Sequence, residues 1–140
     1  MHIAIAVDGS PVSTRAVRHA IKVAGQLAEA PRITIITASP PMMPGVDRKL
    51  GAAAVARYHE QNATFALRGA RAALRRADLA FEEHVEVGFA AETVIRHCNR
   101  IKADLLVMGS RGRGAVRSAF LGSEAIKVLA GSRIPVTIVR

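Results

Sequence analysis

A glycine-rich segment near the end of this 140-residue chain has the spacing of a phosphate-binding device. Gly109 and Gly112 are separated by two residues, and nine residues after Gly112 come Gly122 and Ser123. Glycines let backbone N–H groups approach phosphate oxygens closely, and a helix beginning at Gly122 would add free N–H donors and the positive end of its dipole. Ser123 can also donate its hydroxyl. Because glycine spacing alone is a weak indicator, a surface loop without a ligand is the alternative.

Two commoner phosphate motifs do not fit this segment. Gly109 and Gly114 have P-loop spacing, but Ala115 and Val116 stand where that motif requires Lys and Ser or Thr. The dinucleotide-binding fingerprint fails because Arg117 occupies its third glycine position. The segment therefore belongs to neither class.

Charged side chains accompany the glycines. Arg111 and Arg113 flank Gly112 and can screen phosphate charge. Asp8 ends a short apolar run, where it can bind a ligand or simply cap the turn that follows. Phosphoryl transfer would also need a group that orients the nucleophile, but no Ser/His/Asp arrangement or carboxylate pair stands at a strand end. The histidines lack metal-ligand spacing. We therefore expect binding without catalytic residues and without a metal held by protein ligands alone.

The elements that position these residues alternate along the chain. Strand patterns occur at 2–8, 32–38, 80–87, 103–108 and 134–139, and helical patterns at 11–29, 51–77, 90–101 and 122–131. This order predicts one α/β domain over 1–140, a doubly wound parallel sheet with helices on both faces. Ligands of such sheets bind outside the carboxyl ends of strands, where the winding reverses, and both Asp8 and Gly109 follow strand ends.

The segment 80–87 has the alternation of an edge strand with one side in water. Apolar and polar side chains occupy opposite faces: Phe81, Val85 and Val87 on one, Glu82, His84 and Glu86 on the other. We therefore expect the polar face to be the exposed one.

Composition narrows the class of protein. Half of the residues are apolar, which is enough for one core, and no apolar run approaches the roughly 20 residues that cross a bilayer. The first residues are strand-like rather than a signal peptide, and the single Cys98 cannot form a disulfide within one chain. We expect a cytoplasmic protein with no membrane partner. The formal charge of +9 favours anionic ligands.

A nucleic-acid binder is the rival class. Basic residues share a face of each of the first two long helices: Arg15, Arg18 and Lys22 on one, Arg68, Arg71, Arg75 and Arg76 on the other. Interleaved aromatics for base stacking are missing, and no helix-turn-helix or RNA-binding signature occurs. We interpret these stripes as solvated helix faces, so the sequence does not favour a nucleic-acid partner.

The pattern Gly109-x2-Gly112-x9-Gly122-Ser123 resembles the nucleotide-binding signature of the universal stress protein family, in its ATP-binding subgroup, and matches it without departure. The segments 5–10, 104–112 and 134–140 resemble the first, fourth and last strands of that family. The resemblance covers the whole chain. It implies an adenine nucleotide alpha hydrolase-like fold with five parallel strands in the order 3-2-1-4-5, so that Asp8 and Gly109 lie side by side.

The ligand that the resemblance implies is ATP with Mg²⁺. The implied roles are Asp8 for the ribose or adenine side, Ala38 for the adenine pocket, Met108 and Gly109 flanking the nucleotide, and Gly112, Gly122 and Ser123 for the phosphates. Position 38 often holds a larger aliphatic residue in this family, so Ala38 leaves a thinner adenine wall.

Family members bind ATP and hydrolyse it slowly or not at all, which implies a nucleotide-dependent regulator of stress responses with an unknown protein partner. Relatives form homodimers by pairing their last strands, and Val136 and Ile138 would lie at that seam. A slow ATP hydrolase, and a stress factor that binds nucleic acid or protein without nucleotide, are the alternatives.

Overall fold

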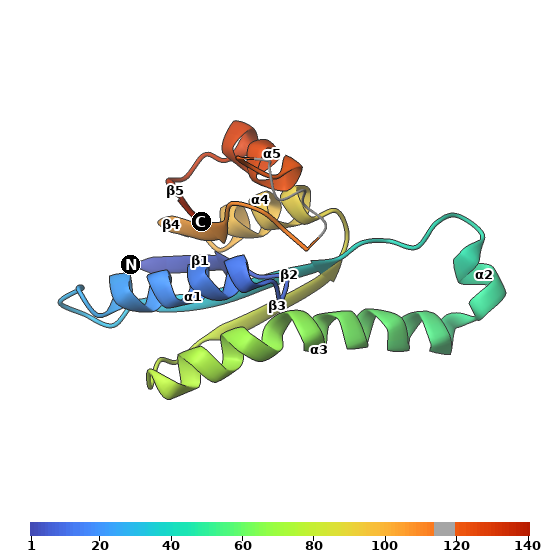
Figure 1. The fold of residues 1–140 in the computed structure, drawn as a ribbon, viewed down its shortest axis with the longest axis horizontal. Coiled ribbons are helices and arrows are strands. Elements are labelled where there is room, and N and C mark those ends of the chain that lie inside the picture. Colours follow the sequence, from blue (N-terminus) through green and yellow to red (C-terminus); the bar gives the residue numbers. More distant parts are fainter. Residues whose placement is uncertain (114–119) are drawn as a thin grey trace.

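The computed structural model describes residues 1–113 and 120–140, and these contain one parallel sheet. The strands are β1 (His2–Ala6), β2 (Arg32–Ser39), β3 (Glu82–Val87), β4 (Leu105–Gly109) and β5 (Val136–Val139). They lie in the order β3-β2-β1-β4-β5, and every neighbouring pair is parallel (Figure 1). The predicted doubly wound sheet and its strand order are confirmed, and β3 and β5 are the edges.

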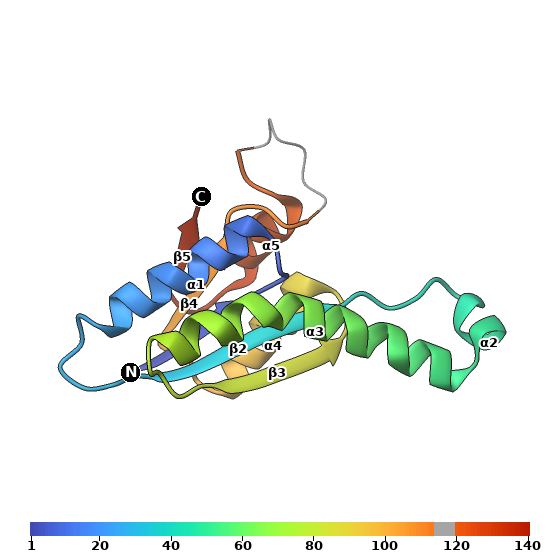
Figure 2. The same ribbon diagram turned by 60° about the horizontal axis from the view of Figure 1, so that its bottom comes forward.

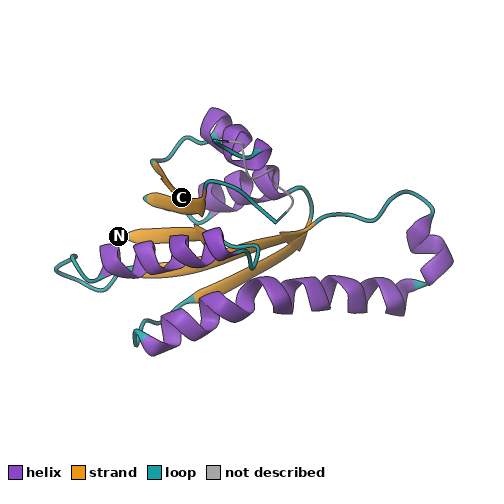
Figure 3. Cartoon of the chain, in the orientation of Figure 1, coloured by secondary structure: helices purple, strands orange, loops and turns teal. Residues whose placement is uncertain are grey.

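Helices cover both faces of this sheet, as predicted (Figure 3). They are α1 (Pro11–Ala24), α2 (Val46–Leu50), α3 (Ala52–Arg76), α4 (Ala90–Arg100) and α5 (Ser123–Gly131). The helices α1 and α3 share one buried cluster with the sheet, and α4 and α5 share another. Among the described residues, no helix is both long and apolar enough to cross a bilayer.

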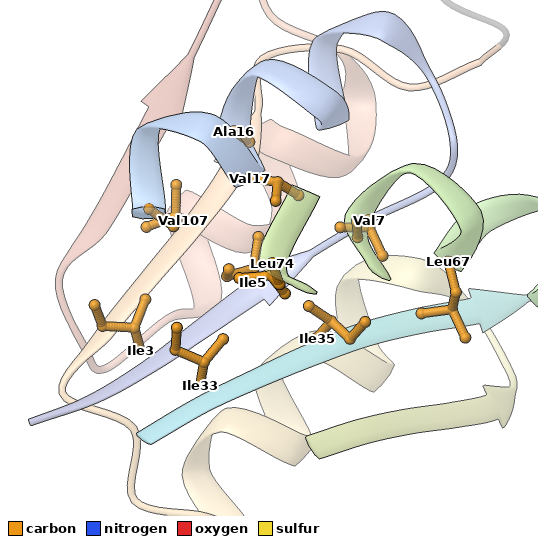
Figure 4. Close-up of a cluster of buried hydrophobic side chains, with 12 residues drawn as sticks. Ile3, Ile5, Val7, Ala16, Val17, Ile33, Ile35, Leu67, Leu74 and Val107 are labelled. Carbon is orange, nitrogen blue, oxygen red and sulfur yellow. The ribbon is translucent and has the colours of Figure 1, made fainter. Parts of the chain in front are cut away.

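The core on the first face follows from the alternation of side chains along a strand. Ile3 and Ile5 of β1 point to the same side as Ile33 and Ile35 of β2, with which they pair in register (Figure 4). Leu67 and Leu74 stand seven residues apart on α3, hence on one face of that helix, and are fully buried against them. The remaining strand positions, among them Ala4, Ile36 and Leu106, face α4 and α5.

The largest differences from the predicted elements lie at the end of the first helix and before the long helix. The first helix ends at Ala24 rather than near residue 29, because Gly25 forms its C-cap and donates to the carbonyl of Ile21 at 3.0 Å. The stretch before the long helix contains the short helix α2, which the sequence did not indicate because its five residues are all exposed.

The orientation predicted for the edge strand holds only at its start, where Phe81 is partly buried and Glu82 is exposed, and is wrong for the rest of β3. Val85 and Val87 are about half exposed, at 45% and 50%, whereas His84 and Glu86 on the opposite face are only partly exposed. The cause is the placement of the helices: α3 packs over β2, and α4 places the buried His97 against His84. The two imidazole rings stack with centroids 3.6 Å apart.

Charged groups surround this histidine pair. Arg100 donates to Nδ1 of His97 at 2.5 Å, which requires a neutral ring because a protonated Nδ1 has no lone pair. His84 Nε2 contacts a carboxylate oxygen of Glu86 at 2.9 Å, and His2 lies close enough to act on His97 by charge. Burial, followed by the charges of His84 and Arg100, lowers the pKa of His97 from 6.5 to about 4.

We predict that acid destabilises the fold through His97. Its pKa is lowered in the folded state, so the unfolded chain binds more protons between pH 6.5 and about 4. Stability is therefore fully present above pH 6.5 and is lost as the pH falls through this window. Urea unfolding at pH 7.5 and 5.0 should show a smaller drop for His97→Gln than for the parent. The half-buried His19 provides the control, and His19→Gln should behave like the parent. Equal drops for the parent and His97→Gln would contradict this account.

Candidate functional site

A cavity of about 590 Å³ opens at the carboxyl ends of β1, β2 and β4, between them and the first turns of α4 and α5. This is the switch point of the sheet, since α1 and the helix after β4 lie on opposite faces. The volume lies within the range of small-molecule pockets. All nine residues predicted to contact or screen a nucleotide line it: Asp8, Ala38, Met108, Gly109, Arg111, Gly112, Arg113, Gly122 and Ser123. Their roles in binding remain predictions.

Asp8 connects the end of β1 to the glycine-rich segment. Its Oδ1 accepts the N–H of Ser10 at 2.9 Å, and its Oδ2 accepts the N–H of Arg113 at 3.0 Å. The first bond is the turn cap that the sequence left open as an alternative. The second spans the switch point and holds the segment after β4 beside β1. Gly114, the last glycine of the segment, lies outside the described residues.

Gly9 allows helix α3 to pack close to the hydrogen bond between Asp8 and Arg113. Its φ of +80° suits glycine, and a Cβ there would lie 2.6 Å from Cε1 of Phe65 on α3. The Phe65 ring in turn has the guanidinium of Arg113 at 5.0 Å from its centroid. Sequence reasoning missed Phe65, because its helical position carries no sign of a contact with a distant loop.

The glycines of the motif stand where side chains have no room. A Cβ on Gly109 would lie 3.0 Å from Cγ1 of Val12, so this glycine allows α1 to pack against the end of β4. A Cβ on Gly112 would lie 3.1 Å from Oδ2 of Asp8, and one on Gly122 would lie 3.3 Å from Cα of Arg111. Gly112 and Gly122 therefore leave the backbone at the rim of the cavity without side chains.

Three helices begin near the carboxyl edge of the sheet, and they differ in how their first N–H groups are satisfied. Ser10 caps α1, because its Oγ accepts the N–H of Ser13 at 3.1 Å. Glu124 of α5 reaches across to α4 and accepts the N–H of Ala91 at 2.8 Å. No side chain caps α5, which begins after Gly122. Among the described residues, α1 and α4 thus each have a side-chain acceptor for one N–H of the first turn, whereas the N-cap of α5 has none and leaves its first donors open to an anion.

Glu124 has a second partner, Lys127, one turn further along α5. Lys127 Nζ lies 2.9 Å from the carboxylate, and this contact, followed by the Ala91 N–H bond, lowers the pKa of Glu124. The carboxylate is therefore ionised and engaged at neutral pH. The spacing of three residues to Lys127 is visible in the sequence, but the reach to α4 is not.

The opposite wall of the cavity is apolar. Ala38 at the end of β2 lies there as expected, with Ile36 of the same strand, Met108 of β4 and Val94 of α4. Such a wall can hold a flat apolar group, while polar donors gather at the α5 end. The cavity is thus apolar at one end and suited to an anion at the other.

Metal binding, the last strand and the single cysteine give three further results. Within the described residues, no group of three or more His, Cys, Asp or Glu side chains could hold a metal ion. The edge strand β5 carries Val136 and Ile138, which pack against the cluster under α4 and α5 and remain partly exposed. Cys98 is buried, and burial raises the pKa of its thiol to about 11, which leaves it unreactive.

Comparison with known proteins identifies relatives along the whole chain. The model of the universal stress protein family matches residues 1–140. Universal stress protein MJ0531 of Methanocaldococcus jannaschii is 27% identical over 139 residues, which cover 99% of this chain and 81% of that protein. A universal stress protein of Thermus aquaticus is 51% identical over 53 residues, 38% of this chain, and the match spans only 39% of its length.

Solved structures have the same fold. Hypothetical protein MJ0577 superposes with a TM-score of 0.84 at 18% identity, covering 99% of this chain and 94% of the other. A universal stress protein in complex with cAMP is 28% identical with a TM-score of 0.74, covering 100% and 97%. The universal stress protein of Archaeoglobus fulgidus in complex with dAMP has a TM-score of 0.73 at 20% identity, covering 100% and 98%.

We predict that Asp8→Ala destabilises the fold, because two backbone N–H groups lose their acceptor. The expected loss in the free energy of unfolding is about 1–3 kcal/mol, measured by urea denaturation. Asp47→Ala is the matched control: Asp47 also accepts two backbone N–H groups, from Gly45 and Arg48, but within the exposed helix α2. Asp47→Ala should cost clearly less. An equal cost would mean that the bond across the switch point adds nothing.

Proposed function

The chain belongs to the universal stress protein family, and we propose that it binds an adenine nucleotide, specifically ATP with Mg²⁺, in the cavity at the carboxyl ends of β1 and β4. The observation that carries this proposal is the uncapped N-terminus of α5, which adjoins Gly112 and Gly122 at the rim of the cavity. The complexes of other family proteins with cAMP and dAMP support the choice of an adenine nucleotide.

The proposed orientation follows from the polarity of the cavity. Phosphates would bind at the first turn of α5, where Ser123 is exposed and Arg111 and Arg113 line the same cavity. The adenine ring would lie against the apolar wall formed by Ala38 and Met108. Asp8 would accept a hydrogen bond from the ribose, since each of its oxygens bonds only one backbone N–H in the described part of the chain.

Mg²⁺ would arrive with the phosphates rather than bind to the protein first. Magnesium sites commonly use one or two carboxylates together with substrate phosphates. The carboxylates lining the cavity are Asp8 and Glu124, and both already accept backbone N–H groups. A positioned general base for the attacking water has no candidate among the described lining residues, which supports a binding role over rapid hydrolysis. Slow hydrolysis is the alternative activity.

We further propose that two copies pair through β5 and that nucleotide occupancy regulates a protein partner in a stress response. The edge position of β5, with Val136 and Ile138 partly exposed, supports such pairing. Sedimentation equilibrium should give a mass of two chains, and Ile138→Arg should shift it toward one. A monomeric parent at micromolar concentration would contradict the homodimer.

Calorimetric titration with ATP and Mg²⁺, repeated with AMP, tests the nucleotide proposal. The parent should bind, and Gly122→Val should bind at least about tenfold more weakly, which corresponds to 1.4 kcal/mol. Because a side chain at position 122 also disturbs packing, Ser123→Asp is the second variant. An acidic side chain in the first turn stabilises a helix but repels a phosphate, so this protein should fold and bind ATP poorly.

Two controls isolate the site. Gly25→Val makes the same change where a Cβ has room, with its nearest neighbours at 3.7 Å. Gln26→Asp adds the same charge at an exposed position away from the cavity. Both controls should bind like the parent. Absence of binding by the folded parent, or equal weakening by variants and controls, would contradict the proposal.

A further inference from the structure

The helices α1 and α3 form one layer of the molecule that is strongly basic. α1 carries three basic residues and no acid, and α3 carries five arginines and the single acid Glu60. The layer therefore has eight basic residues against one carboxylate, a net charge of +7 out of +9 for the chain. The opposite layer, α4 and α5, has three Lys or Arg residues against two glutamates. The charge is thus concentrated on one face.

Helical periodicity directs these basic residues outward. On α1 the exposed Arg15, Arg18 and Lys22 lie within about 60° of one another, opposite the buried face of that helix. On α3 the exposed Arg57, Arg68 and Arg75 form a second stripe, whose successive members are eleven and seven residues apart. α1 packs against α3, and the two helices lie in front of the sheet in Figure 2. The sequence showed two separate stripes, and the fold places both on the same side of the sheet; these six residues are here called the basic face.

The charges of the basic face are not neutralised by the protein itself. Within the described residues, no carboxylate forms an ion pair with any of the six side chains. Arg71 is different, because it binds Glu83 through two hydrogen bonds of 2.6 and 2.5 Å. Arg15 donates to the backbone oxygen of Arg140 at 2.7 Å. The basic face therefore presents a field of one sign to the solvent.

The basic face offers little apolar surface to a partner. Of the exposed large apolar residues in the described chain, none belongs to α1 and two, Tyr58 and Phe65, belong to α3. The Phe65 ring lies close to two cations, Arg68 and Arg113, at 5.8 and 5.0 Å, and the Tyr58 ring lies edge-on to that of His59 with centroids 5.2 Å apart. Protein interfaces need an apolar or aromatic centre, and helices that bind in a membrane surface need an apolar face. Binding to a nucleic-acid backbone needs neither, because counterion release drives it.

We propose that the basic face binds the phosphate backbone of double-stranded nucleic acid, without reading its sequence. The cations of α1 are three and four residues apart, hence about 4.5 and 6 Å apart along the axis, a spacing that suits successive phosphates. Those of α3 are eleven and seven residues apart, about 16 and 10 Å, and would meet phosphates further along the backbone. The two exposed aromatic side chains of α3, Tyr58 and Phe65, already lie against His59 and against Arg68 and Arg113, so the proposed binding rests on the cations and not on base stacking. The binding is separate from the nucleotide cavity, which lies at the end of the sheet.

Fluorescence anisotropy of a labelled random-sequence DNA duplex, measured across a salt series, tests this proposal. The parent should bind at about 50 mM salt and weaken steeply as salt rises. The triple variant Arg18→Gln, Lys22→Gln, Arg75→Gln should bind at least tenfold more weakly at low salt. The slope of log affinity against log salt should shrink by up to about 2.7, or 0.9 for each lost phosphate contact.

A control with the same net charge separates the basic face from the overall charge. Arg48→Gln, Lys49→Gln, Lys102→Gln removes three exposed cations outside α1 and α3, so both triple variants carry +6 instead of +9. This control should keep most of the affinity and slope of the parent. Equal weakening of the two triple variants would overturn the proposal, as would no duplex binding by the folded parent at low salt.

Two further experiments test other classes of partner and the independence of the basic face from the nucleotide cavity. Polyglutamate and phosphatidylserine vesicles, added as competitors, should displace the duplex poorly, and stronger binding of either would overturn the assignment to nucleic acid. Ser123→Asp, which is designed to impair ATP binding, should bind the duplex like the parent. Failure of the nucleotide proposal and failure of this one are therefore distinguishable.

Discussion

The candidate site depends on the carboxylate of Asp8, which joins two segments that are 105 residues apart in the sequence. One oxygen caps the turn after β1, and the other holds the backbone of Arg113 after β4. Gly9 and Gly109 make this link possible, because side chains at either position would meet Phe65 or Val12. These close approaches place the ends of β1 and β4 side by side, and the cavity opens at that point.

Electrostatics then distinguish two candidate binding regions, the cavity at the start of α5 and the basic face. Ser10 and Glu124 each accept one N–H of the first turns of α1 and α4, whereas α5 has no such side-chain cap in the described chain and its first donors face the cavity. The six residues of the basic face on α1 and α3 form no ion pair with a carboxylate in the described chain, and their charge is directed to the solvent. A small anion and a large polyanion would thus bind at separate places.

Much of this arrangement could be predicted from the sequence, because it depends on local patterns. Strand and helix order follow from apolar periodicity, and the spacing of Gly109, Gly112 and Gly122 predicted residues that line one cavity. What failed depends on contacts between distant elements. The alternation in β3 gave no sign that α3 would leave Val85 exposed while α4 brought His97 onto His84. The cap that Glu124 provides for α4 was equally invisible, since it joins residues 33 apart.

The most direct test of the central claim is to locate the ligand by backbone amide NMR while AMP or ATP is added. If the nucleotide binds at the switch point, the amides of Ser10, Gly109, Gly112 and Ser123 shift in proportion to occupancy. The amides of α2 and of the amino end of β1 stay in place, because they lie away from the cavity lining. Shifts confined to other regions, or none at a concentration that saturates calorimetric binding, would contradict a site built on the Asp8 link.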